Sequence, residues 1–188
     1  MYIPSMKFSL WADFIERDFL DDGFKTLIDK NIVNGATSNP AIFKSSILSS
    51  PAYKEQLSTL DGLSPKEKYE AVAIYDIQKA ADVLRPLYDA GNDGYVSIEV
   101  DPYLCDDAAG TLEEGKRLYA QIDRPNVMIK VPATAAGYEA MEGLVAEGIA
   151  VNATLIFSKE QALSCASAFN RAIERTSKPV DTVISVFV

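Results

Sequence analysis

Lys130 has the strongest chemical implication of any residue in this sequence. It stands in the middle of NVMIKVPAT at residues 126–134, an apolar run with the composition of a buried strand. Moving an ammonium group out of water is costly, so a buried lysine tends either to pair with a carboxylate or to lose its proton. A neutral amine can attack a carbonyl carbon and form a Schiff base. Residue type alone favours a structural ion pair, so the choice depends on the neighbouring residues.

Other polar residues fall toward the carboxyl ends of apolar runs, where parallel α/β enzymes place their active sites. They are Asp13, Asn39, Glu99, Asp101, Asn152, Thr154 and Ser185. Alternate residues of a strand share a face, so Asn152 and Thr154 are expected to point the same way. A buried lysine, carboxylates that carry protons and neutral groups that hold sugar hydroxyls are the parts that a Schiff-base aldolase needs.

Each of these residues also has a simpler interpretation. Asp13 could cap a following helix, Asn39 could belong to a turn before the proline that follows it, and Asp101 could end a strand. The amide and hydroxyl groups farther along the chain could be satisfied polar groups of the core. Glu99 is harder to explain in this way, because it lies within an apolar strand and a buried carboxylate needs a partner.

The composition excludes several classes of function. The 188 residues are 48% hydrophobic with a formal net charge of -9, which indicates one globular domain and argues against nucleic-acid binding. The sequence contains no histidine, the commonest general base and zinc ligand, and we expect neither a metal nor another cofactor. Cys105 and Cys165 lack metal-ligand spacing and predict free thiols in the cytoplasm. No apolar stretch reaches the roughly 20 residues that a membrane span requires.

Short apolar segments alternate with longer helical patterns, which predicts βα units around a parallel sheet without an antiparallel hairpin. The predicted strands occupy residues 8–13, 32–37, 95–101, 127–131, 149–156 and 182–188. Helices are predicted over 64–91, 107–121, 137–146 and 158–176, with shorter helices within 41–60. Ser64 before a proline, and Ser158 with Gln161 at capping-box spacing, mark two helix starts.

The strand pattern favours a (β/α)8 TIM barrel over an open doubly wound sheet, because no Gly-rich phosphate loop follows the first strand. Residues 1–188 are therefore predicted to form a single α/β barrel domain that supplies about the first six βα units. A complete barrel needs eight units and about 250 residues. The last strand is followed by no loop or helix, which would leave an open sheet edge. We expect a barrel that is incomplete at its C-terminus, in a fragment of a longer chain.

The sequence resembles the transaldolase family in five stretches that occur in the same order. They are LWAD at 10–13, GATSNPAIF at 35–43, VSIEVDP at 96–102, NVMIKVPAT at 126–134 and VNATLIFS at 151–158. The resemblance spans essentially the whole chain and implies a class I aldolase mechanism on a TIM barrel, in the non-oxidative pentose phosphate pathway. It also implies sugar-phosphate substrates and no cofactor, and it leaves both a monomer and a homodimer open.

The resemblance further implies a role for each candidate residue. Lys130 would form the Schiff base with a ketose phosphate such as fructose 6-phosphate or sedoheptulose 7-phosphate. Asp13 would accept the C4 hydroxyl proton as the C3–C4 bond breaks, and Glu99 would carry protons through a water held by Thr154. The retained dihydroxyacetone unit would be held by Asn39, Asn152 and Ser185, with Phe187 as a wall of the pocket. In the family an arginine a few positions beyond Phe187 binds the substrate phosphate, and this sequence ends before it.

Two other functions stay open. A related aldolase of the fructose 6-phosphate aldolase type would release its three-carbon unit rather than transfer it. A non-catalytic sugar-phosphate-binding barrel would keep the fold without the chemistry. The joint presence of Lys130, Glu99 and Asp13 argues against a pure binding protein, because binding alone does not need a buried amine.

Overall fold

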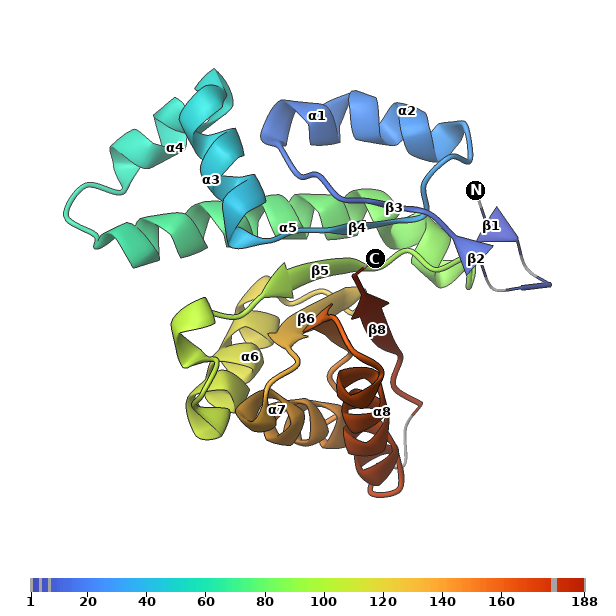
Figure 1. The fold of residues 1–188 in the computed structure, drawn as a ribbon. Helices are drawn as coiled ribbons and strands as arrows, with labels where there is room; N and C mark the ends of the chain where they lie inside the picture. Colours follow the sequence, from blue (N-terminus) through green and yellow to red (C-terminus); the bar gives the residue numbers. More distant parts are fainter. Residues whose placement is uncertain (1, 4, 7, 177–178, 188) are drawn as a thin grey trace. The chain divides into compact units, whose positions relative to one another are not determined.

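The computed structural model describes residues 2–3, 5–6, 8–176 and 179–187, which form two compact units (Figure 1). The first unit comprises Met1–Ser97 and Ile122–Val127, and the second comprises Ile98–Gln121 and Met128–Val188. Strand β5 (Val96–Glu99) begins in the first unit and ends in the second. Each unit has its own set of fully buried apolar side chains.

The first unit contains a short parallel sheet. Strand β3 (Trp11–Ala12) pairs with β4 (Gly35–Thr37), and β4 pairs with the first half of β5. The prediction of one strand over residues 8–13 is wrong, because β2 (Phe8–Ser9) instead pairs antiparallel with β1 (Tyr2–Ile3). The expectation that no antiparallel hairpin occurs is wrong for the same reason.

Several short helices follow these strands. Helices α1 (Arg17–Asp21) and α2 (Gly23–Asp29) lie between β3 and β4, and the sequence pattern predicts neither, because they are too short to show a clear period. Helix α3 (Pro40–Ser49), the 3-10 turn η1 (Pro51–Tyr53) and α4 (Lys54–Thr59) confirm the short helices predicted within 41–60.

Helix α5 (Pro65–Asp89) is the longest of the described helices. It opens with a reciprocal capping box, in which the Ser64 hydroxyl accepts from the Glu67 N–H and the Glu67 carboxylate accepts from the Ser64 N–H. Its inner face consists of fully buried residues: Val72, Ala73, Ile77, Ala80, Ala81 and Leu84. Asp76 lies on the same face and is also fully buried. An ionisable side chain therefore stands in the core of the first unit.

The second unit is a parallel sheet in the order β5-β6-β7-β8. Strands β6 (Val127–Pro132), β7 (Val151–Ile156) and β8 (Thr182–Val186) confirm the strands predicted at 127–131, 149–156 and 182–188, except that residue 188 lies outside the described residues. After the 3-10 turn η2 (Pro102–Leu104), helices α6 (Ala108–Ile122), α7 (Ala135–Ala146) and α8 (Lys159–Ile173) follow in turn.

Close packing of this helical layer depends on glycines at contact points. A Cβ on Gly143 of α7 would lie 3.0 Å from Leu112 of α6. A Cβ on Gly137 would lie 2.0 Å from the Pro132 carbonyl oxygen, so α7 can begin this close to the end of β6 only with glycine there. Figure 1 shows α6, α7 and α8 following β5, β6 and β7 in turn.

The fold class follows from this alternation. Within the described residues, β3 to β8 are parallel and successive strands are connected through helices, which confirms the predicted α/β class and the plan of a (β/α)8 barrel. That residues 1–188 form one barrel domain stays a prediction.

Candidate active site

Lys130 lies on β6, and its neighbour Ile129 shows which way its side chain points. The Cγ2 atom of Ile129 is 3.2 Å from the position that a Cβ would occupy on Gly115 of α6, so Ile129 faces the helices. Because side chains alternate along a strand, Lys130 points to the opposite face. The residue is 6% exposed. Its amine is therefore largely withdrawn from water, as the apolar run predicts.

Glu99, the last residue of β5, is the carboxylate partner of Lys130. The Nζ atom of Lys130 lies 3.9 Å from Oε2 of Glu99, and the two side chains are 8% and 12% exposed. Burial raises the pKa of Glu99, while the positive charge of Lys130 acts in the opposite direction and lowers it. Burial is the larger effect. A carboxyl group with a raised pKa next to an amine is suited to hold a proton and pass it on.

Asn152 and Ser185 extend this polar group across β7 and β8. In the parallel register Asn152 lies beside Lys130, so their side chains leave the sheet on the same face. The Ser185 hydroxyl donates a hydrogen bond of 2.7 Å to Oδ1 of Asn152. The structure thus brings together Glu99, Lys130, Asn152 and Ser185 from four neighbouring strands of the second unit. These four residues are called the lysine cluster below.

Thr154 lies near the carboxyl end of β7 and is almost fully buried. Its carbonyl oxygen accepts a 2.9 Å hydrogen bond from the Ala133 N–H. The next residue, Leu155, has a φ of 57°, in the left-handed region that costs a non-glycine residue about 1–2 kcal/mol. The pairing of β7 with β8 shifts register between Ala153 and Ile156. This bulge bends the strand directly after Thr154 and stores backbone strain beside the lysine cluster.

Phe187 follows β8 and is 47% exposed. Its N–H donates to the Ile156 carbonyl oxygen, and its ring centroid lies 5.2 Å from that of Phe157. The two rings form an exposed aromatic pair after β7 and β8. That Phe187 forms a wall of the substrate pocket stays a prediction.

The sequence does not predict that Gln161 of α8 lies at the carboxyl ends of β6 and β7. Its side chain accepts from the Phe157 N–H at 2.8 Å and donates to the carbonyl oxygens of Ala133 and Leu155 at 3.1 and 3.2 Å. The Ser158–Gln161 spacing predicts a capping box, and the structure shows the serine half, with the Ser158 hydroxyl accepting from the Gln161 N–H. The Gln161 amide instead connects the ends of β6 and β7. Spacing alone cannot distinguish these two uses of a glutamine.

Asp13 and Asn39 lie in the first unit. Asp13 directly follows β3 and is exposed, and the N-cap of α1 is Glu16, so the interpretation of Asp13 as a helix cap is wrong. Asn39 does have a local structural role, because its Oδ1 accepts the Ile42 N–H at 2.8 Å and caps α3. Whether Asn39 also holds substrate stays a prediction.

Asp101 caps a 3-10 turn and does not end a strand, because β5 ends at Glu99. Its carboxylate accepts the Tyr103 N–H at 2.9 Å at the start of η2. Its own N–H donates to Glu114 of α6 at 2.6 Å. Glu114, which the sequence does not single out, therefore holds the chain just after Glu99.

The described residues also limit other interpretations. Among them, no group of three or more His, Cys, Asp or Glu side chains is arranged to hold a metal ion. Across these same ranges, no helix has the length and apolar character needed to cross a membrane. Cys105 and Cys165 are both free thiols. The chemistry that the lysine cluster itself offers is that of an amine beside a carboxyl group, with an amide and a hydroxyl nearby.

A buried amine beside a carboxyl group can form a Schiff base, and the two groups lie on parallel strands of the kind that build (β/α)8 barrels. The family model described as Transaldolase/Fructose-6-phosphate aldolase matches residues 10–188. The chain belongs to this family. The match and the strand–helix alternation together confirm the predicted fold, a partial TIM barrel.

Curated relatives agree with this assignment. A protein of Campylobacter jejuni subsp. jejuni serotype O:23/36 (strain 81-176) named Transaldolase is 52% identical over 192 residues, covering 96% of this chain and 59% of the relative. One of Helicobacter pylori (strain Shi470), also named Transaldolase, is 46% identical over 183 residues, covering 97% of this chain and 56% of the relative. The chain therefore spans less than two thirds of the length of these relatives.

Proposed function

We propose that this protein is a transaldolase that transfers a dihydroxyacetone unit between sugar phosphates through a Schiff base on Lys130. The donor would be fructose 6-phosphate or sedoheptulose 7-phosphate, and the acceptor glyceraldehyde 3-phosphate or erythrose 4-phosphate, in the non-oxidative pentose phosphate pathway. The observation that carries the proposal is the buried Lys130–Glu99 pair, 3.9 Å apart, on strands within the family match. The shared name of the relatives supports the same reaction.

The first half of the reaction uses the lysine cluster. The Lys130 amine attacks the ketone carbon, and the carbinolamine that forms loses water to give a protonated imine. Both steps move protons, which Glu99 would carry with a water held by Thr154. The raised pKa of Glu99 supports this role, because a carboxyl group that titrates closer to neutral pH can both donate and accept. Asn152 and Ser185 would bind hydroxyls of the sugar.

The second half breaks and remakes a carbon–carbon bond. Asp13 would accept the C4 hydroxyl proton as C4 becomes an aldehyde and the C3–C4 bond breaks. The C3–C4 electron pair forms the C2–C3 double bond and the imine π pair moves to nitrogen, which leaves an enamine on Lys130 and releases an aldose phosphate. The enamine carbon then attacks the acceptor aldehyde, and the steps run in reverse. Asn39 would help to hold the three-carbon unit, and Phe187 would shield it from water. The exposed carboxylate of Asp13, directly after β3, supports its assignment as the base.

Borohydride trapping tests this proposal. The natural polypeptide is incubated with fructose 6-phosphate, reduced, and examined by intact and peptide mass spectrometry. We expect a reduced dihydroxyacetone adduct on the peptide that contains Lys130, and none in a Lys130→Met variant. Lys159→Met, which changes an exposed lysine of α8, is the matched control and should give the full adduct. A folded protein without any adduct would exclude the Schiff-base reaction and favour a sugar-phosphate-binding barrel.

A second candidate is an aldolase of the fructose 6-phosphate aldolase type, because the family description covers both activities. Such an enzyme would turn over fructose 6-phosphate alone and release free dihydroxyacetone. A transaldolase would hold the enamine until an aldose phosphate is added. Measuring dihydroxyacetone release with and without erythrose 4-phosphate therefore separates the two.

The proposal extends to location and partners. Two free thiols, Cys105 and Cys165, support a reducing compartment such as the cytoplasm. The net charge of -9 supports small sugar phosphates rather than nucleic acid as partners. Sedimentation would distinguish a monomer from a homodimer.

A further inference from the structure

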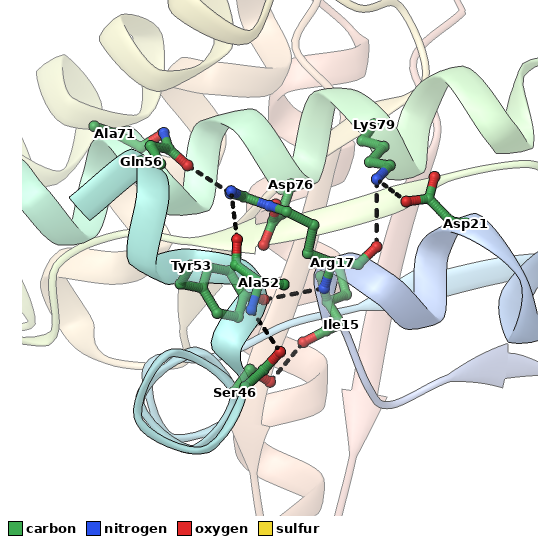
Figure 2. Close-up of polar contacts among 11 residues, drawn as sticks. Ile15, Arg17, Asp21, Ser46, Ala52, Tyr53, Gln56, Ala71, Asp76 and Lys79 are labelled. Carbon is green, nitrogen blue, oxygen red and sulfur yellow. Dashed lines mark hydrogen bonds and ion pairs between the residues drawn. The ribbon is translucent and has the colours of Figure 1, made fainter. Parts of the chain in front are cut away.

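The chain just after Asp13 is held by side chains from three other elements of the first unit (Figure 2). The Ser46 hydroxyl of α3 donates to the Ile15 carbonyl oxygen at 2.8 Å. The Tyr53 hydroxyl of η1 accepts the Arg17 N–H at 3.1 Å, and Lys79 of α5 donates to the Arg17 carbonyl oxygen at 3.3 Å. Each of these bonds reaches backbone between residues 15 and 17. This segment is therefore tied to the helices that surround it.

The Arg17 side chain makes further contacts in the core of the first unit. Its Nε and Nη2 atoms both lie 2.9 Å from Oδ1 of Asp76, and Nη2 also donates to Gln56 at 2.6 Å. The guanidinium stands 4.8 Å from the Tyr53 ring centroid and 4.5 Å from that of Tyr75. Asp76 is fully buried, and the Arg17 side chain is 13% exposed. Figure 2 shows Arg17 at the centre of these contacts, which are called the Arg17 anchor below.

A buried ion pair of this kind contributes more to fixing the local geometry than to the stability of the fold. Burial raises the pKa of the Asp76 carboxyl, and the Arg17 charge only partly offsets this cost. Well-packed apolar side chains would fill the same volume at lower cost, but they would not direct hydrogen bonds. Burial and the nearby Asp76 carboxylate raise the pKa of Tyr53, which keeps its hydroxyl neutral. The directed bonds of the anchor thus hold one arrangement of residues 15–17.

Asp13 lies between this anchor and a second attachment. On its N-terminal side, Trp11 and Ala12 are paired with Gly35 and Ala36 in the parallel sheet. On its C-terminal side, Ile15 is fully buried and bonded to Ser46. Residues 13–14 therefore connect two backbone segments that are both fixed, residues 11–12 by strand pairing and Ile15 by its hydrogen bond to Ser46.

We propose that Arg17 is a positioning residue that, through its anchor, holds the segment carrying Asp13 and so directs the Asp13 carboxylate at the bond to be cleaved. This proposal rests on the proposed function, in which Asp13 accepts the C4 hydroxyl proton. Arg17 acts through the chain and does not touch substrate. A misplacement of about 1 Å in a reacting group can lower a rate by roughly 10²-fold, so loosening this segment should show in the cleavage step.

The mass of the trapped adduct tests the proposal, because borohydride captures the imine either before or after carbon–carbon cleavage. An uncleaved adduct carries the hexose phosphate, and a cleaved adduct carries dihydroxyacetone. Arg17→Lys keeps the charge but loses the planar fork, Tyr53→Phe removes one hydroxyl, and Ser46→Ala removes another. We expect unchanged total adduct in all three, with the uncleaved share raised about tenfold or more.

Two control variants change the same types of residue at other positions of the first unit. Arg124→Lys alters another Arg–Asp pair, in which Arg124, between α6 and β6, contacts Asp82 of α5 at 2.6 and 3.1 Å. Ser49→Ala alters a serine of α3 that bonds within its own helix. Both should leave the ratio of cleaved to uncleaved adduct unchanged. In an Asp13→Ala background, Arg17→Lys should add no further change, because the group that it positions is gone.

The outcomes distinguish failure of the proposed reaction from failure of the positioning role of Arg17. Absence of any adduct in the natural protein would overturn the proposed function, and this inference with it. If the adduct forms and Asp13→Ala raises its uncleaved share, but the Arg17, Tyr53 and Ser46 variants do not, the positioning role is refuted. Equal losses of both adducts in folded variants would also refute it, since a general structural defect would affect both steps alike.

Discussion

The pair formed by Lys130 and Glu99 should show strong energetic coupling in a double-mutant cycle. The single variants are Lys130→Met, which leaves the Glu99 carboxyl group without this cation, and Glu99→Gln, which leaves the amine without this carboxylate. At the observed 3.9 Å separation, two unit charges at an effective dielectric constant of about 20 interact by about 4 kcal/mol. The low exposure of both side chains means that little of this interaction is screened by solvent.

Urea unfolding at pH 7 measures this coupling as a free energy. The double variant removes both buried charges and should be close to the natural protein in stability, whereas each single variant should lose several kcal/mol. The coupling energy is the difference between the double change and the sum of the single changes. A value below about 1 kcal/mol would refute the pair as a desolvated ion pair, because exposed pairs already reach that magnitude.

The pH dependence provides an independent check. Burial raises the pKa of Glu99 above its usual value of 4.5 and Lys130 lowers it, so Lys130→Met must raise it further. The folded variant then keeps a proton that the unfolded chain has released. Its free energy of unfolding should therefore fall as pH rises from 4.5 through the raised pKa of Glu99. Adding Glu99→Gln should remove this decline, and a decline that persists in the double variant would contradict the assignment to Glu99.

Three further outcomes follow from single positions. Gly137→Ala should lower the free energy of unfolding in urea by about 3 kcal/mol, because the new Cβ would lie 2.0 Å from the Pro132 carbonyl oxygen. Gln161→Leu removes three hydrogen bonds at the ends of β6 and β7 and should cost about 1–2 kcal/mol in the same assay. Cys165 is fully buried and its pKa is raised to about 11, so a thiol reagent at pH 8 should label Cys105 in the folded protein and Cys165 only after unfolding.

Matched controls make these outcomes specific. Gly115→Ala introduces a Cβ 3.0 Å from a methyl group of Leu144, a side chain that can move, so its cost should be smaller than that of Gly137→Ala. Gln121→Leu changes an exposed glutamine of α6 and should be nearly neutral. Equal losses in either comparison would contradict the contact geometry. Rapid labelling of both thiols in the folded protein would contradict the burial of Cys165.

Much of the fold could be predicted from local patterns. The continuous apolar run at 127–131 predicts β6, and Ser64 with the following proline predicts the start of α5 at Pro65. These signals are strong because they depend on residues close together in the chain. The prediction of one strand over 8–13 is wrong, because a short apolar segment can pair with a distant parallel strand or with a nearby antiparallel one, and its own pattern does not distinguish them. Helices α1 and α2 are held by contacts with other elements rather than by their own period.

The residues of the candidate site likewise differ in whether the sequence alone reveals them. Lys130 and Glu99 are recognisable because a charged residue in an apolar strand is costly and therefore conspicuous. Gln161 and Arg17 are not, because a polar residue at a helix start has many ordinary uses. Their partners, Ala133 and Asp76, are far away in sequence and come close only through packing.

The sequence by itself determined the residue types, the alternation of strands and helices, and the positions at which a charge would be buried. It thereby determined the fold class and the amine, since period and polarity are local properties of the chain. The tertiary structure alone decided which carboxylate lies beside Lys130, that Asn152 is bonded to Ser185, and that Arg17 reaches Asp76. These are pairings between distant segments, and they depend on strand register, helix packing and side-chain direction, which no local pattern encodes.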